Sequence, residues 1–196
     1  MTQVSLMDLI AGAKAGKVVS FPTDTVPALA ALPEKAELIF TAKKRQLDKP
    51  LILMAAEVED FWQYVEGNQK EYEIWQKVAK KYLPGALTLV LPASSSVAKQ
   101  MNPYDPTTIG LRVPNSDIAR KILAETGPLA TTSANLSGQV ALEKIKEIDE
   151  QFPDVLVLVE TEISLTTNTT SVPSTVAKWL DNDWQILRQG PVILYS

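Results

Sequence analysis

Residues 128–138 read Pro-Leu-Ala-Thr-Thr-Ser-Ala-Asn-Leu-Ser-Gly, an apolar start followed by a run of hydroxyl and amide side chains. The apolar part predicts a buried strand over residues 129–132, and the polar part predicts a binding site where that strand ends. Hydroxyl and amide groups bind amino, carboxylate, ribose and phosphate groups without carrying a fixed charge. Taken alone, the stretch is also compatible with an ordinary polar turn.

Helical and strand patterns alternate on both sides of this segment. Apolar residues recur at helical spacing in residues 5–15, 34–44, 58–64, 69–82, 116–126 and 142–151. Short apolar runs predict strands at residues 18–21, 50–54, 87–91, 109–113, 129–132, 155–159, 175–179 and 184–187. Because the last two strands are separated by a short polar turn, they predict a hairpin. We therefore expect an α/β fold in which helices cover a mixed sheet.

The composition limits the chemistry that the chain can carry out. It has 196 residues, of which 45% are hydrophobic, and we expect one domain over residues 1–196. It contains neither cysteine nor histidine, which excludes disulfides, zinc–thiolate sites, histidine metal sites and a Ser-His-Asp triad. Carboxylates, lysines, hydroxyls and backbone dipoles remain, so we expect no protein metal site.

Charge and hydropathy narrow the possible partners. The formal net charge of -4 and the pI of about 5.0 argue against extended non-specific binding to nucleic acid, although a local basic pocket is compatible with them. No stretch approaches the roughly 20 apolar residues of a membrane span, and residues 1–15 lack the pattern of a signal peptide. We expect a cytoplasmic protein with no membrane partner.

Familiar nucleotide-binding fingerprints do not fit, because residues 12–18 have the wrong glycine spacing for a P-loop and no Gly-x-Gly-x-x-Gly occurs. The ends of several predicted elements nevertheless carry residues that can bind phosphate or carboxylate groups. These are Thr23, Thr25, Lys43, Arg45, Lys49, Thr108, Arg112, Ser133, Asn135, Ser174 and Arg188. If the loops that hold them converge, they form a pocket for an anionic ligand.

Single members of this set have simpler explanations. Lys43 and Arg45 lie at the end of the helix predicted at residues 34–44, where the helix dipole favours cations. The spacing also places Lys43 on the apolar face of that helix. Arg112 ends an apolar strand, where alternation turns its guanidinium either into a cleft that binds a carboxylate or toward solvent. Lone hydroxyls such as that of Ser174 are commonly caps or turn formers.

The sequence also suggests roles for two further segments. The aromatic residues of the helix predicted at residues 69–82 have the spacing of packing residues rather than of a cofactor site. Residues 161–174 are rich in threonine and serine and lack a strong apolar period, which makes them the best candidate for a mobile loop or lid.

The order and spacing of short motifs along nearly the whole chain resemble the YrdC family. The motifs are Pro-Thr-Asp-Thr-Val at 22–26, Lys-Lys-Arg at 43–45, Pro-Gly-Ala-Leu-Thr at 84–88, Thr-Ile-Gly-Leu-Arg-Val-Pro at 108–114, Thr-Ser-Ala-Asn-Leu-Ser-Gly at 132–138, Ser-Thr-Val at 174–176 and Leu-Arg at 187–188. The Lys-x-Arg and Ser-x-Asn tripeptides are specific in combination, whereas neither is informative alone.

The resemblance implies an L-threonylcarbamoyladenylate synthase, a nucleotidyltransferase. Such an enzyme makes threonylcarbamoyl-AMP and pyrophosphate from ATP, L-threonine and bicarbonate or CO2, for the t6A modification at position 37 of tRNA. It also implies a twisted sheet around a large concave, positively charged cavity, Mg2+ carried on the nucleotide, a separate threonylcarbamoyl transferase complex as partner, and a possible contact with tRNA or double-stranded RNA.

The resemblance assigns a ligand to each candidate residue and no catalytic side chain. It implies L-threonine contacts at Thr25, Arg112, Ser133 and Ser174, and ATP contacts at Lys43, Arg45, Lys49, Thr108, Asn135 and Arg188. These roles are physically reasonable, because in-line attack on the α-phosphorus is accelerated mainly by positioning and charge stabilisation.

The chain departs from the family pattern after Val26. The family continues with Tyr-Gly-Leu-Gly, whereas this chain has Pro-Ala-Leu-Ala at 27–30, which we expect to stiffen a loop in the pocket wall. Met54 also stands where longer relatives often have histidine. These changes favour an alternative, a YrdC-like paralogue that binds nucleotide or structured RNA without this activity. A small-molecule-binding or kinase-like protein of unrelated type is a third possibility.

Overall fold

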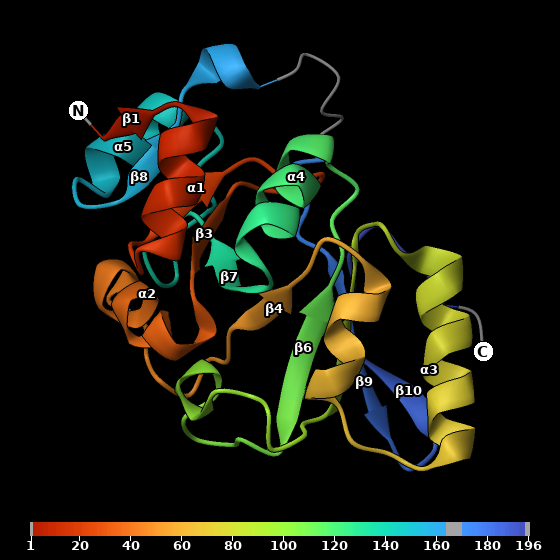
Figure 1. Cartoon of the computed structure of the whole chain (residues 1–196). Helices are drawn as coiled ribbons and strands as arrows, with labels where there is room; N and C mark the ends of the chain where they lie inside the picture. The colour runs from red at the N-terminus through yellow and green to blue at the C-terminus, as the bar shows by residue number, and fades with distance from the viewer. Residues whose placement is uncertain (1, 164–169, 195–196) are drawn as a thin grey trace.

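Figure 1 shows the computed structural model, which describes residues 2–163 and 170–194. Within these residues ten strands form one sheet in the order β1-β8-β2-β3-β7-β4-β6-β5-β9-β10. The strands are β1 Gln3–Val4, β2 Val19–Phe21, β3 Ala28–Ala31, β4 Ile52–Met54, β5 Leu87–Pro92, β6 Thr108–Arg112, β7 Leu129–Ser133, β8 Leu156–Leu158, β9 Thr175–Leu180 and β10 Asp183–Arg188. Parallel and antiparallel pairs both occur, and β9 and β10 form the expected hairpin. The predicted α/β fold with a mixed sheet is therefore confirmed.

Five α-helices and four short 3-10 helices connect these strands in the described part of the chain. They are α1 Leu6–Lys14, α2 Ala36–Lys43, α3 Gln69–Tyr82, α4 Asp117–Thr126, α5 Ile145–Gln151, η1 Pro33–Lys35, η2 Val58–Tyr64, η3 Lys99–Met101 and η4 Glu160–Glu162. Ser5 and Ser116 cap α1 and α4 by accepting hydrogen bonds from the backbone N–H of Asp8 and Ala119. None of the helices in this part of the chain has the length and apolar character that crossing a membrane requires.

Three predicted helices differ from the observed ones. Residues 58–64 form a 3-10 helix, because Val65 leaves it in an extended conformation and pairs with Ala93. Residues 34–44 are divided into the turn η1 and the helix α2, and the last predicted helix begins at Ile145 rather than at residue 142.

The prediction of a stiffened loop at residues 27–30 is wrong, because Ala28–Ala31 is the fully buried strand β3. It pairs with β2 through Val19 and Ala30, and with β7 through Ala28 and Ser133. Small alanines suit a strand that is covered on both faces, but an all-apolar run shows no period of two. The same lack of pattern hid the two-residue strand β1.

Strand alternation divides the side chains of the sheet between two faces. Ile109 and Leu111 of β6 point to the first face, where α2, η2, α3 and α5 cover a continuous core that buries Phe61 and Trp75 completely. On the second face α1 and α4 pack over β2, β3, β7 and β8 and form a smaller core. Figure 1 shows α1 and α4 over that half of the sheet, whereas α3 lies beside β9 and β10. The described helices leave the other half of the second face open.

Candidate functional site

The uncovered half of the second face forms a cavity of about 460 Å³. Its floor consists of alternate residues of neighbouring strands. On β6 Thr108, Gly110 and Arg112 face the cavity, whereas Ile109 and Leu111 face the opposite core. The sheet thus supplies a rigid floor whose polar groups lie at strand ends.

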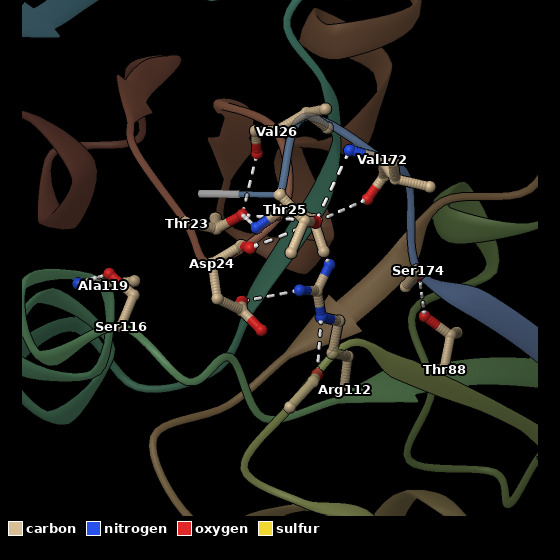
Figure 2. A network of polar contacts seen from close by, with 12 residues as sticks. Thr23, Asp24, Thr25, Val26, Thr88, Arg112, Ser116, Ala119, Val172 and Ser174 are labelled. Atoms are coloured by element: carbon tan, nitrogen blue, oxygen red, sulfur yellow. Dashed lines mark hydrogen bonds and ion pairs between the residues drawn. The ribbon is translucent and has the colours of Figure 1, made fainter. Parts of the chain in front are cut away.

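Arg112 is the most deeply buried cation in the wall of this cavity (Figure 2). Its Nη2 lies 2.6 Å from Asp24 Oδ1, its Nη1 donates to Thr25 Oγ1 at 2.8 Å, and its Nε donates to the Gly85 carbonyl at 3.1 Å. Burial lowers the pKa of the guanidinium, and the charge of Asp24 opposes that effect. Of the two orientations that the sequence left open for Arg112, the structure shows the one into the cavity. The protein uses part of its donor fork, and the remaining N–H groups are left for a ligand.

The loop that joins β2 and β3 carries Asp24 and Thr25 to Arg112. Thr23 Oγ1 donates to the Val26 carbonyl at 2.8 Å and accepts a hydrogen bond from the backbone N–H of Thr25 at 3.2 Å. These bonds close the loop on itself in a side-chain-stabilised turn. Thr25 lines the cavity, as predicted, and Asp24 supports Arg112 from outside the cavity lining.

The predicted lid at residues 161–174 lies partly outside the described residues, because these exclude 164–169. After this gap, the backbone N–H groups of Thr170 and Ser171 each donate at 3.1 Å, to the carbonyls of Asp24 and Thr25 respectively. The segment that leads into β9 is thereby joined to the β2–β3 loop beside the cavity. Whether residues 161–174 act as a lid stays a prediction.

Ser174 and Arg188 form a second polar group in the cavity wall. Arg188 donates from Nε to the Ser174 carbonyl at 3.0 Å and from Nη2 to Ser174 Oγ at 3.2 Å. Ser174 Oγ also lies 2.9 Å from Thr88 Oγ1 (Figure 2). The hydroxyl network fixes the direction of an arginine that is otherwise exposed at the rim.

Lys43, Ser133 and Asn135 form a third polar group, which joins α2 to the end of β7. The ammonium of Lys43 donates to the Ser133 carbonyl and, at 3.3 Å, to Asn135 Oδ1. Ser133 Oγ donates to the same amide oxygen at 2.5 Å. Lys43 is completely buried, and burial, with a smaller effect of the Arg45 charge, lowers the pKa of its ammonium from 10.5 to about 7. Its place on the apolar face of the helix is confirmed.

Arg45 follows α2 and turns back toward the start of β4. Its Nε donates to the Lys49 carbonyl at 3.0 Å and its Nη2 to the Pro50 carbonyl at 3.2 Å. Burial lowers the pKa of this guanidinium, and the nearby carboxylate of Asp48 opposes the effect. Arg45 and Asp48 both line the cavity.

The structure brings most of the predicted residues to one place. The cavity lining includes Thr25, Arg45, Thr108, Arg112, Ser133, Ser174 and Arg188. Lys43 and Asn135 lie behind Ser133, outside the lining, and Lys49 contributes its backbone carbonyl to Arg45 while its side chain is exposed.

The cations of this region differ in what neutralises them. Arg112 is paired with the carboxylate of Asp24. Among the described residues, Lys43, Arg45 and Arg188 instead donate only to carbonyl, amide or hydroxyl oxygens, which are neutral. A group of cations without carboxylate partners attracts anions into a concave site. In the part of the chain that the structure describes, the cavity lining therefore holds two arginines without a direct carboxylate partner, Arg45 and Arg188, and one arginine that is paired, Arg112.

Three residues with clear structural roles were missed from the sequence. Asp24 is part of a quoted motif, but only the fold brings it to Arg112. Gly110 leaves the middle of the cavity floor without a side chain. Lys178 lines the cavity from β9. The alternation of residues 175–179 could have predicted the position of Lys178, because it places Lys178 on the face of the strand opposite Ala177 and Trp179.

The fold and the site together define an α/β protein with a cavity lined by several cations on the open face of a mixed sheet. The sequence profile of the Sua5/YciO/YrdC family, described as telomere recombination, matches residues 12–190. This chain belongs to that family, and the resemblance seen in its motifs is confirmed.

Named relatives of the chain include two synthases. It is 33% identical to the threonylcarbamoyl-AMP synthase of Vibrio vulnificus over an alignment of 151 residues. This alignment covers 75% of this chain and 80% of the relative. It is 32% identical to the putative threonylcarbamoyl-AMP synthase of Methanocaldococcus jannaschii over an alignment of 184 residues. This alignment covers 90% of this chain and 81% of the relative.

Solved structures share the fold. P. abyssi Sua5 complexed with L-threonine superposes with a TM-score of 0.82 at 29% identity, over 94% of this chain and 54% of that one. The chain thus spans about half the length of that Sua5. E. coli YciO superposes with a TM-score of 0.78 at 22% identity, over 95% of this chain and 89% of that one, which shows a common fold.

Proposed function

We propose that this protein is an L-threonylcarbamoyladenylate synthase, which forms threonylcarbamoyl-AMP and pyrophosphate from ATP, L-threonine and bicarbonate or CO2. The observation that carries the proposal is the difference in charge compensation within one site. Lys43, Arg45 and Arg188 have only neutral acceptors, whereas Arg112 is paired with Asp24. A triphosphate needs several uncompensated cations, and an amino acid carboxylate needs one positioned guanidinium. The names of the relatives support the same activity.

The two ligands occupy different parts of the site in this proposal. L-threonine lies at Thr25, Arg112, Ser133 and Ser174, and ATP is bound by Lys43, Arg45, Lys49, Thr108, Asn135 and Arg188. Because Lys43 and Asn135 lie behind Ser133, they act on the nucleotide from behind the end of β7. Ser133 is the point where the two ligands meet.

The chemistry follows from positioning. The amino group of L-threonine attacks CO2, loses a proton and becomes a carbamate. A carbamate oxygen then attacks the α-phosphorus, a new P–O bond forms, and the P–O bond to pyrophosphate breaks. Fixed cations stabilise the charge that develops on the phosphoryl oxygens and on the leaving pyrophosphate. No histidine is needed for this step, which agrees with a chain that has none.

Mg2+ enters this proposal with the nucleotide. It binds oxygen ligands and usually keeps several waters while it contacts substrate phosphates and one or two carboxylates. Asp48 and Asp105 line the cavity and supply such carboxylates. When bound, the ion would neutralise part of the phosphate charge.

The chemistry of the proposed product indicates which partners the protein needs. An activated threonylcarbamoyl group must pass to another molecule, so we propose a separate transferase complex that modifies tRNA at position 37, with direct tRNA contact and a cytoplasmic location as further predictions. The paralogue alternative is not favoured, because its main support was a changed loop at residues 27–30. That segment is the buried strand β3, which continues the sheet.

Release of pyrophosphate from ATP by the purified protein tests the proposal. We expect release only when both L-threonine and bicarbonate are present, and Arg112→Ala should raise the KM for L-threonine while ATP binding is retained. Arg120→Ala is the control, since Arg120 pairs with Glu57 outside this cavity. Pyrophosphate release that does not depend on L-threonine, or no release at all, would contradict the proposed function.

A further inference from the structure

Lys178 is the one cation of the cavity lining to which no role has been given. It lies in the middle of β9, and its side chain is half-buried. Its neighbours in the strand, Ala177 and Trp179, point to the opposite core, whereas Val176 and Lys178 face the cavity. The direction of the side chain is therefore fixed by the strand.

The ammonium of Lys178 differs from the other cations of the lining. Arg45, Arg112 and Arg188 each donate to at least one backbone carbonyl. In residues 2–163 and 170–194, Lys178 has no hydrogen bond, and no carboxylate lies within 4.0 Å of it. Asp105 acts on this ammonium only through its charge, so an anionic ligand at this place would give the ammonium a direct partner.

The register of the sheet places Lys178 at the end of a row of cavity residues. Lys178 pairs with Val90, Val90 with Gly110, Gly110 with Ile52, and Ile52 with Thr131. Neighbouring strands are about 4.8 Å apart, so Gly110 lies roughly 10 Å from Lys178 across the floor. Because Gly110 has no side chain, a ligand that rests on it comes within reach of an extended lysine.

Arg188 lies on β10, the strand next to β9, and lines the same cavity. It pairs with Val176, two residues before Lys178, and its guanidinium is held at Ser174. Successive residues on one face of a strand are roughly 7 Å apart. The backbone of Lys178 thus lies one such step along β9 from the Val176–Arg188 pair, and both cations face the same cavity, where one polyphosphate can contact both.

We propose that Lys178 binds the polyphosphate of the nucleotide substrate, beside Arg188, and thus also contacts the pyrophosphate that leaves. This inference rests on the proposed function, because it assumes that the cavity holds ATP. Asp105 is the competing partner. The pKa of its carboxyl is lowered mainly by hydrogen bonds from Thr107 and, to the smallest extent, by the charge of Lys178. A simple surface attraction between Asp105 and Lys178 is the alternative to a ligand role.

Binding of ATP and of AMP to Lys178→Met distinguishes these explanations. Methionine keeps the apolar stem and removes the charge, and Lys178→Gln is a second variant that keeps a polar end. We expect both to bind ATP about tenfold more weakly, AMP within twofold of the wild type and L-threonine unchanged, since a charge-assisted hydrogen bond to phosphate is lost. Lys178→Arg should retain most of the affinity.

Lys77→Met is the control. Lys77 is exposed on α3, so its loss changes the net charge equally without reaching the cavity. Unchanged ATP affinity in Lys178→Met, or equal losses for ATP and AMP, would overturn the phosphate assignment alone. A wild-type protein that does not bind ATP would overturn the proposed function and this assignment together.

Discussion

Lys43→Met is expected to change how the stability of this protein depends on pH. Lys43 is completely buried, its ammonium donates to two neutral oxygens, and its pKa falls from 10.5 to about 7. One pKa unit corresponds to about 1.4 kcal/mol, so protonation of the unfolded chain disfavours the native state by up to about 5 kcal/mol at low pH. Methionine keeps the length of the side chain and removes the titration.

The sign follows from the protons bound in each state. Above pH 10.5 Lys43 is neutral in both states and has no effect. Between pH 10.5 and about 7 the unfolded chain binds a proton that the folded protein does not, so the native state loses stability as the pH falls. Below about pH 7 both states are protonated and the penalty is constant. The wild type should therefore gain stability from pH 7.5 to 9.5.

Urea unfolding at these two pH values measures the effect. The gain of the wild type over Lys43→Met should be about 2.5 kcal/mol, which is the part of the titration that falls between them. Other titrating groups affect both proteins equally and cancel. Lys77→Met, at an exposed site on α3, should follow the wild type. Parallel pH profiles for Lys43→Met and the wild type would show that Lys43 titrates normally and would refute the argument.

Three further changes test the cavity and the fold. Gly110→Val should reduce ATP or L-threonine binding by more than tenfold, because the added methyl groups extend into the cavity toward the ligand. The Tm should change little, because a Cβ at Gly110 comes no closer than 3.4 Å to Ile52. Normal binding in calorimetry would show that no ligand rests on Gly110. Asp24→Ala should lower the free energy of unfolding by about 3–5 kcal/mol, because it leaves Arg112 buried without its charged partner. A loss below about 1 kcal/mol in urea unfolding would contradict this expectation. Ser5→Ala should lower it by about 1 kcal/mol through loss of the α1 cap, and an unchanged midpoint would argue against the cap.

The parts of the fold that could be predicted are those in which local pattern and tertiary structure agree. Helix α3 has the predicted bounds because its apolar residues keep helical spacing and Asn68 caps its start. Alternation at residues 109–113 correctly put Arg112 on the face opposite Ile109 and Leu111, but whether that face is a cavity or solvent was left open and is decided by the fold. Likewise, the spacing of α2 placed Lys43 on its buried face.

The parts that could not be predicted depend on contacts between distant segments. Strand β3 is apolar at every position, so no period shows which way its side chains point. The pairing of Asp24 with Arg112 joins residues 88 positions apart, and the sequence holds no local sign of it. The role of Lys178 depends on its row across β5, β6 and β4, which only the register defines.

The charge pattern of the site connects ligand binding to stability. Lys43 and Arg45 donate to neutral acceptors, and burial lowers the pKa of both, although the charge of Asp48 opposes the effect at Arg45. Under the proposed function, we expect a bound polyphosphate to add negative charge and to raise the pKa of Lys43 toward its ordinary value. Above about pH 7 the complex must then take up a proton that the free protein lacks. The same anion stabilises the folded state by mass action, because the unfolded chain offers it no such arrangement. We therefore expect the proposed substrate both to stabilise the folded protein and to increase its proton uptake above about pH 7.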